Sequence, residues 1–252
     1  MSQTLALSRA LIALADDHLI LGHRLSEWCG HAPMLEEDLS MPNMALDMLG
    51  QARNLYTYAG ELEGKGRNED DIAYLRTDRQ YMNCLLVERP NGDFAHTMLR
   101  QLYFGAFMQP FWEAAAASSD EHVRAIAQKA EKEIAYHIRH SGEWVIRLGD
   151  GTEESARRMQ DAVTALHIYT DELFTQTDDL KVCGDAGLLP NPQKMRDAWN
   201  RTIEQIFNQA FLTMPEVPFP QEGGRHGRHT EDFGHLLSEL QYMQRTYPGM
   251  TW

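Results

Sequence analysis

The sequence is short of several features that define whole classes of protein. No stretch approaches the roughly 18 consecutive apolar residues of a transmembrane helix, so we expect no membrane span. The three cysteines, Cys29, Cys84 and Cys183, lie far apart and match no metal-ligand spacing, which indicates reduced thiols. The N-terminus has no basic segment ahead of an apolar one, so we expect no secretory leader. Together these absences predict a cytoplasmic protein.

Positive charge is also scarce. The chain has 23 Lys and Arg against 37 Asp and Glu, a formal net charge of −14. Such a chain repels phosphate backbones, which excludes nucleic acid as a general partner. The sequence also contains no Ser-His-Asp or Cys-His arrangement, phosphate-binding loop or dinucleotide-binding fingerprint. An anionic small ligand would therefore need a local basic pocket, or a partner chain that supplies one.

What the sequence has instead is helical periodicity, with no alternating run typical of strands. Apolar residues recur at the 3.6-residue spacing of amphipathic helices. We predict helices over residues 5–28, 43–62, 94–117, 120–149, 152–174, 191–214 and 230–245, with short helical turns between 71 and 88. Asp93 and Thr152 are expected N-caps, Pro42 is expected to precede the second helix, and residues 175–189 are expected to form a loop. The prediction is an all-α fold of about seven or eight helices in a single domain, residues 1–252.

The predicted helix over 120–149 carries an acid and a histidine on its apolar side. His137 lies in the middle of the apolar stripe, and Glu133 lies one turn earlier. Di-iron bundles use Glu-x-x-His on two helices and one Glu on each of two others. Here the acid and the histidine are four residues apart, and Asp47 of the second helix is followed three residues later by Gly50. Asp47, Glu133 and His137 are therefore candidates for a degenerate metal site, and a core histidine bonded to Glu133 or a tyrosine is the simpler interpretation of His137.

The predicted helix over 94–117 argues most strongly against a working metal site. From residue 94 to residue 112 it contains no Asp or Glu, so it can offer no carboxylate ligand. Acid-x-x-His spacings occur at Asp93 and His96 and at Asp232 and His235. With 37 acids and 11 histidines, however, such matches arise by chance. Both acids also lie in first turns, where capping accounts for them.

Two polar stretches have alternative interpretations. Asp47 begins a polar stripe with Gln51, Asn54 and Tyr58, which we predict to be a solvated face rather than an inward network that replaced a metal. The glycine-rich loop, residues 223–229, places Arg225 and Arg228 in an acidic chain. These arginines are candidates for contact with an anion or a partner, and a solvated connector is the alternative.

Several motifs together resemble the family of structural, non-catalytic subunits of bacterial phenylacetyl-CoA epoxidases. They are 27–33 (EWCGHAP), 46–54 (LDMLGQARN), 88–95 (ERPNGDFA), 136–139 (YHIR), 147–152 (RLGDGT), 229–231 (HTE) and 241–252 (QYMQRTYPGMTW). The likeness covers nearly the whole chain. It implies a ferritin-like helical bundle that has lost its di-iron ligands and itself holds no cofactor.

The resemblance also implies partners. A homologous catalytic subunit would hold the di-iron centre and the CoA thioester, and a reductase subunit would supply electrons from NADPH. The assembly would epoxidise the aromatic ring of phenylacetyl-CoA during phenylacetate catabolism. We expect this chain to bind the catalytic subunit and other subunits of the complex, and to be able to form a homodimer when isolated because its interface would then be exposed.

Two other functions remain open at this point. One is a ferritin-like metalloenzyme with an unconventional site built from His18, Asp47, Glu133 and His137. The other is a CoA-ester hydrolase without iron, for which the sequence offers no nucleophile arrangement.

Overall fold

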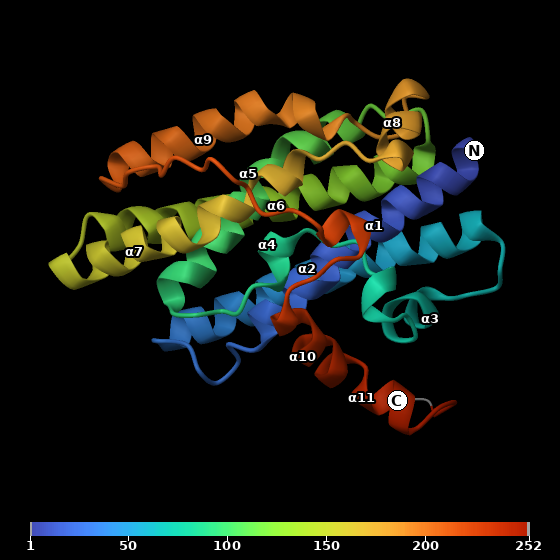
Figure 1. The fold of residues 1–252 in the computed structure, drawn as a ribbon, viewed down its shortest axis with the longest axis horizontal. Helices are drawn as coiled ribbons and strands as arrows, with labels where there is room; N and C mark the ends of the chain where they lie inside the picture. Colours follow the sequence, from blue (N-terminus) through green and yellow to red (C-terminus); the bar gives the residue numbers. More distant parts are fainter. Residues whose placement is uncertain (1, 251–252) are drawn as a thin grey trace. The chain divides into compact units, whose positions relative to one another are not determined.

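The computed structural model describes residues 2–250, and these residues form helices and no strands (Figure 1). The α-helices are α1 (Gln3–Ser26), α2 (Leu35–Glu63), α3 (Glu69–Tyr74), α4 (Leu85–Glu88), α5 (Phe94–Ala115), α6 (Glu121–Gly149), α7 (Glu153–Leu166), α8 (Asp178–Asp185), α9 (Arg196–Gln209), α10 (Glu231–Leu240) and α11 (Tyr242–Thr246). Short 3₁₀ turns join several of them. Eight of the α-helices have seven residues or more, so the predicted all-α, ferritin-like class is confirmed.

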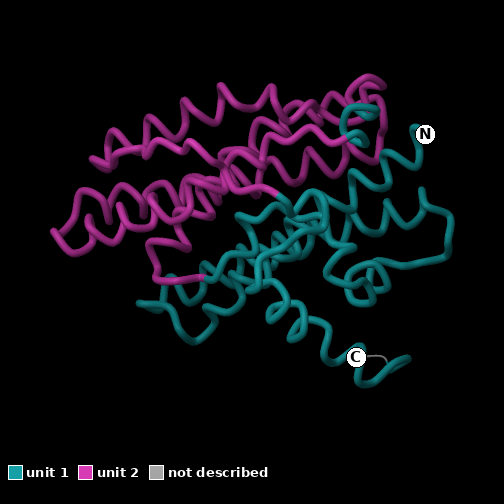
Figure 2. The backbone as a smooth tube through the Cα atoms, in the orientation of Figure 1, with its two compact units in different colours: residues 1–90, 178–183, 223–252 teal, residues 91–177, 184–222 magenta. Residues whose placement is uncertain are grey.

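The chain divides into two compact units, and both are discontinuous in sequence (Figure 2). Unit 1 comprises residues 1–90, 178–183 and 223–252, and it is built on the pair α1 and α2. Unit 2 comprises residues 91–177 and 184–222, and in it α5 and α6 pack together with α7 and α9. A single domain over residues 1–252 stays a prediction.

In unit 1, α1 and α2 pack closely because small residues meet at their contact. A Cβ atom added to Gly22 of α1 would lie 3.1 Å from the Cβ of Met48 and 3.2 Å from the carbonyl oxygen of Ala45. Met48 and Leu49 of α2 lie against Gly22, and both helices bury large apolar side chains, including Leu11 and Met44. The close approach allows these side chains to interdigitate at interior packing density.

In unit 2, α5 is buried on all sides. Its apolar residues show no single face, which is the pattern of a helix surrounded by others. α6, α7 and α9 all contact it. The Trp199 indole of α9 donates a hydrogen bond of 3.0 Å to the Tyr103 carbonyl of α5, which satisfies a polar atom inside this core. The central helix that carries no carboxylate over residues 94–112 is thus the most enclosed element of unit 2.

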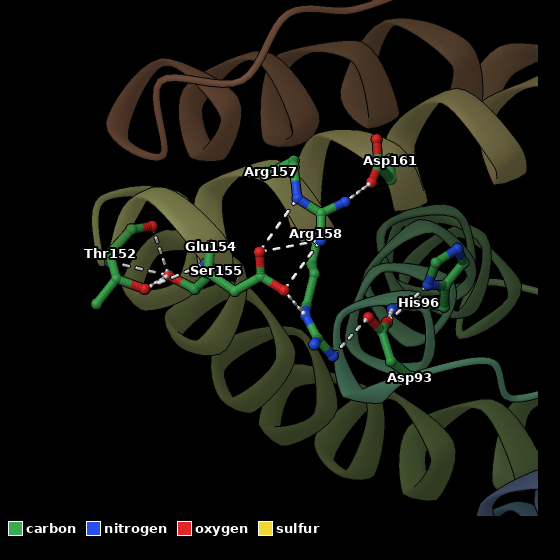
Figure 3. Close-up of polar contacts among 8 residues, drawn as sticks. All are labelled: Asp93, His96, Thr152, Glu154, Ser155, Arg157, Arg158 and Asp161. Carbon is green, nitrogen blue, oxygen red and sulfur yellow. Dashed lines mark hydrogen bonds and ion pairs between the residues drawn. The ribbon is translucent and has the colours of Figure 1, made fainter.

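Helix starts that depend on a local capping side chain agree with the sequence analysis. The Asp93 carboxylate accepts from the His96 amide at 3.1 Å, and the Thr152 hydroxyl accepts from the Ser155 amide at 3.2 Å (Figure 3). α6 begins where expected, at Glu121, with Asp120 as its cap. These caps satisfy amide groups that the helix itself leaves unbonded.

Other boundaries were predicted wrongly. α2 begins at Leu35 rather than residue 43, and Pro42 lies inside it. The acids of residues 36–38 therefore form its first turn, where the helix dipole favours them, and this helix tolerates the one amide that proline removes. The first helix begins at Gln3 rather than residue 5, with Ser2 as its cap, and it ends at Ser26. The expected loop over 175–189 contains α8, and α7 ends at Leu166 before two 3₁₀ turns.

Candidate functional site

His137 of α6 is fully buried in unit 2, as predicted. Its Nδ1 atom lies 3.2 Å from the amide nitrogen of Gln101 of α5, which is also fully buried. The Gln101 amide N–H donates and Nδ1 accepts. The main-chain carbonyl of His137 accepts from the Ser141 hydroxyl at 2.7 Å. The imidazole is therefore oriented by a neutral amide, a partner that sequence reasoning missed.

Gln101 is the residue of α5 that contacts His137. It offers a carboxamide, which is neutral and a poor substitute for a bridging carboxylate. Its Oε1 atom is buried and has no hydrogen-bond partner among the residues the structure describes. A lone glutamine on an apolar helix has no spacing signature, so only the fold shows that Gln101 faces His137.

The remaining members of the predicted degenerate site are divided between the two units. Glu133 is one turn before His137 on α6, but it is partly exposed and lies 3.5 Å from the Lys129 amine. Asp47 is half-buried on α2 and belongs to unit 1, whereas Glu133 and His137 belong to unit 2. His18, in unit 1, is buried with Nδ1 2.7 Å from the Leu14 carbonyl oxygen.

These donors do not fit a di-iron centre. α5 can supply no carboxylate between residues 94 and 112, and the buried histidine of α6 faces an amide. Within residues 2–250, no group of three or more His, Cys, Asp or Glu is arranged to hold a metal ion. The polar stripe of α2 is also only partly solvated, because Gln51 is 1% exposed while Asn54 is exposed.

Unit 1 uses its buried carboxylates differently. Asp16 of α1 is fully buried and forms an ion pair with Arg76, whose Nη1 atom lies 3.0 Å from Oδ2. The Tyr56 hydroxyl and the Met82 amide also donate to this carboxylate, the latter at 2.8 Å. Burial, and then the charge of Asp16, raise the pKa of Tyr56 well above its usual range, so the phenol stays protonated and donates. Asp16 thus has a cation and two neutral donors.

The neighbouring Asp17 has a second arginine. The Arg225 Nη2 atom lies 2.7 Å from Asp17 Oδ2, and the Cys84 amide donates to Oδ1 at 2.7 Å. Arg225 also donates to the Met82 carbonyl at 3.0 Å. Burial raises the pKa of Asp17, and the charge of Arg225 opposes that rise. In a metal bundle a metal balances such buried carboxylates; here guanidinium groups balance them.

A third buried carboxylate fixes the end of the glycine-rich loop. Glu88 is fully buried, and it accepts from Asn83 at 2.8 Å, from His229 Nδ1 at 2.7 Å and from the Thr230 amide at 2.6 Å. Burial alone would lower the pKa of His229, but the hydrogen bond and charge of Glu88 outweigh it and raise that pKa. Arg24 of α1 donates to the Glu88 carbonyl, at 2.8 Å from Nη2. The acids of unit 1 therefore hold distant segments together.

The glycine-rich loop packs against residues 79–85 of unit 1. A Cβ atom on Gly224 would lie 2.1 Å from the Asn83 carbonyl oxygen, so only glycine allows this approach. Arg225 is 7% exposed and serves an internal carboxylate, whereas Arg228 is exposed. Contact with an anion or a partner stays a prediction, and Arg228 is the arginine of this loop with an exposed side chain.

A cluster of charged residues in unit 2 consists of exposed ion pairs. Arg157 pairs with Glu154 and Asp161 of α7, and Arg158 pairs with Glu154 at 2.7 Å and with Asp93 at 3.8 Å (Figure 3). All five side chains have 30% exposure or more. Solvent screens exposed pairs of this kind, so they contribute little to stability.

Comparisons with known proteins relate the chain to phenylacetate catabolism. A family model described as "Phenylacetic acid catabolic protein" matches residues 1–252. One of the subunits of the 1,2-phenylacetyl-CoA epoxidase of Escherichia coli (strain K12) is 43% identical over 242 residues, which cover 96% of this chain and 97% of that protein. Across residues 2–250, no helix has the length and apolar character needed to cross a bilayer.

Proposed function

The chain belongs to the family of phenylacetic acid catabolic proteins, and from that premise we propose that it is the structural subunit of a multicomponent phenylacetyl-CoA epoxidase. The family and the 43% identical epoxidase subunit of Escherichia coli support a role in phenylacetate catabolism. That identity extends over nearly the full length of both chains, so the correspondence applies to the subunit as a whole.

One observation carries the non-catalytic assignment. The helix at the centre of unit 2, α5, has no acid between residues 94 and 112 and presents Gln101 to His137. A di-iron centre needs one or more carboxylates from each of four helices. In unit 1, Asp16 and Asp17 are already paired with arginines. The chemistry of these groups is that of a stable core, and it does not activate oxygen.

The role that this core supports is mechanical. The geometry of metal ligands depends on the rigidity of the shell around them, so a rigid neighbouring bundle can hold the helices of a catalytic subunit in place. In this proposal the homologous catalytic subunit holds the di-iron centre and the CoA thioester. A reductase subunit uses NADPH, and the assembly works in the cytoplasm, where the three thiols stay reduced. A permanent interface of this kind buries on the order of 2,000 Å² or more.

Co-expression with the catalytic subunit tests the proposal. We expect one complex in size exclusion at high salt, with the iron in the catalytic subunit. The isolated chain, expressed with supplementary iron, should retain well below one ion per chain by elemental analysis. Two tightly bound irons that are lost on Glu133→Ala would identify a metalloenzyme instead. A catalytic subunit that is fully active alone and elutes apart from this chain would contradict the structural role.

A further inference from the structure

α2 carries apolar residues on two faces, and in unit 1 only one of them is covered. Its inner face packs on α1 and is buried. On the outer face Leu35, Leu39 and Leu46 are 70%, 60% and 64% exposed. A helix that is apolar on both sides is typical of one that lies between two neighbours. In unit 1, α1 covers the inner face and α3 also contacts α2, but the three leucines stay exposed.

The three leucines form one narrow stripe, which we call the α2 stripe. At 100° per residue, Leu35, Leu39 and Leu46 point within about 40° of one another, over a length of about 16 Å. Gly50 follows one turn later close to the same line, and a Cβ atom added there would meet nothing within 4 Å. A leucine stripe that continues into an open glycine lets another helix pack closely along it.

The charges beside the α2 stripe are acidic. Glu36 and Asp47 lie on one side of the stripe, and Asp38 lies on the other. Glu36 is exposed, and the two aspartates are half-buried. We propose that the α2 stripe is the contact for a helix of the catalytic partner subunit, and that this helix has an apolar stripe of its own flanked by Lys or Arg. The inference rests on the proposed function and adds to it the surface and the chemistry of the partner.

Charge decides between this occupant and the alternatives. A second copy of this chain also has a formal charge of −14 and would bring its own acids to the contact, so like charges would face one another. A membrane surface is anionic and binds helices whose polar flanks are basic, the reverse of those found here. The same acids attract a partner helix with basic flanks, which raises the association rate and fixes the register of the two helices.

The size of the stripe sets its share of the interface. A helix about 10 Å wide over about 16 Å covers roughly 160 Å², against about 800 Å² for each partner in a standard interface. The α2 stripe is therefore one element of a larger contact. Since a minority of interface residues carries most of the binding energy, leucines at its centre can still dominate.

The test compares three identical substitutions in the full-length chain. Leu39→Glu and Leu46→Glu place a carboxylate in the α2 stripe, and Leu75→Glu places one on a leucine that is 56% exposed elsewhere in unit 1. Binding to the purified catalytic subunit is measured by titration calorimetry, and circular dichroism checks the fold. We expect the two stripe variants to bind about ten-fold more weakly or worse, and the Leu75 variant to change affinity by less than about two-fold. Glu36→Lys should slow association at low salt.

The possible results distinguish a failure of the proposed contact surface from a failure of the proposed function. If the wild-type chain binds and both stripe variants bind equally well, the α2 stripe is not the contact, although the structural role stands. If the wild-type chain does not bind, the proposed function itself fails. A wild-type homodimer that Leu39→Glu dissociates and that the catalytic subunit does not displace, or wild-type binding to phosphatidylglycerol vesicles, would assign the stripe to a second copy or to a membrane and overturn the proposal. An unchanged association rate for Glu36→Lys would refute the basic flanks.

Discussion

Arg225 offers a sharp test of how the glycine-rich loop is held. Its guanidinium is buried against Asp17, with a 2.7 Å ion pair and a 3.0 Å hydrogen bond to the Met82 carbonyl. The side chains of Arg225 and Asp17 are 6% and 0% exposed. Arg225→Met keeps most of the length of the side chain and removes its charge. The substitution leaves Asp17 buried with the Cys84 amide at 2.7 Å and without its cation.

The expected loss follows from that unpaired charge. Breaking a buried pair by removing one partner lowers the free energy of unfolding by about 3–5 kcal/mol, because the remaining ion has lost its solvent and its counter-ion. In a chain of this size, 1 kcal/mol corresponds to roughly 2–4 °C in melting temperature, so a fall on the order of 10 °C is expected. Asp17→Leu combined with Arg225→Met should recover much of the loss, since both charges are then absent.

Thermal and urea unfolding followed by circular dichroism measure the effect. Arg228→Met is the matched control, because Arg228 is exposed in the same loop; its change should stay within about 0.5 kcal/mol. A loss below about 1 kcal/mol for Arg225→Met would refute the reasoning, as would equal losses for the two arginines. A small loss would mean that water or another cation replaces the guanidinium, and equal losses would mean that burial of Arg225 has no special effect.

The same variant should show a distinctive pH dependence. Burial already raises the pKa of Asp17 above its ordinary value near 3.8, and removing Arg225 takes away the charge that opposes the rise. The folded variant therefore binds a proton more tightly than the unfolded chain does. The loss in its free energy of unfolding relative to the wild-type chain should be smallest near pH 4 and grow as the pH rises through the raised pKa. A deficit that does not change with pH would mean that lost packing, not the unpaired carboxylate, causes the instability.

Three further predictions concern other parts of the core. His137→Ala should lower the free energy of unfolding by about 1–3 kcal/mol, from a cavity and an unpaired amide, yet leave the turnover of the reconstituted complex largely intact; lost turnover at a normal melting temperature would contradict this. His229→Gln should reduce stability most below pH 6.5, with the deficit shrinking as the pH rises through the raised pKa that Glu88 maintains. Gly149→Ala should lower the free energy of unfolding in urea by about 1–3 kcal/mol, because its Cβ would lie 2.3 Å from a carbonyl oxygen. Gly50→Ala, in open space, should raise that free energy by about 0.5–1 kcal/mol. Equal effects would contradict the steric argument.

The parts of the fold that the sequence predicts well are those set by neighbouring residues. Asp93 and Thr152 cap their helices with bonds to amides three residues on, so the signal lies within one turn. The 3.6-residue pattern likewise identifies α6 from Glu121 to Gly149. Pro42 misleads because its local preference is to end or begin a helix, and packing of α2 on α1 overrides that preference. α8 is too short, at eight residues, for its periodicity to stand out.

The candidate site shows the reverse case. The absence of acids from residue 94 to residue 112 can be read directly, and it already argues against a carboxylate-bridged metal. The ion pairs that balance the buried acids cannot be predicted from the sequence, because Asp16 pairs with Arg76 across 60 residues and Asp17 pairs with Arg225 across 208. No spacing rule connects such partners. A buried acid on α1 has the same appearance in sequence whether a metal or a guanidinium balances it, and only the fold distinguishes a ligand from one half of an ion pair.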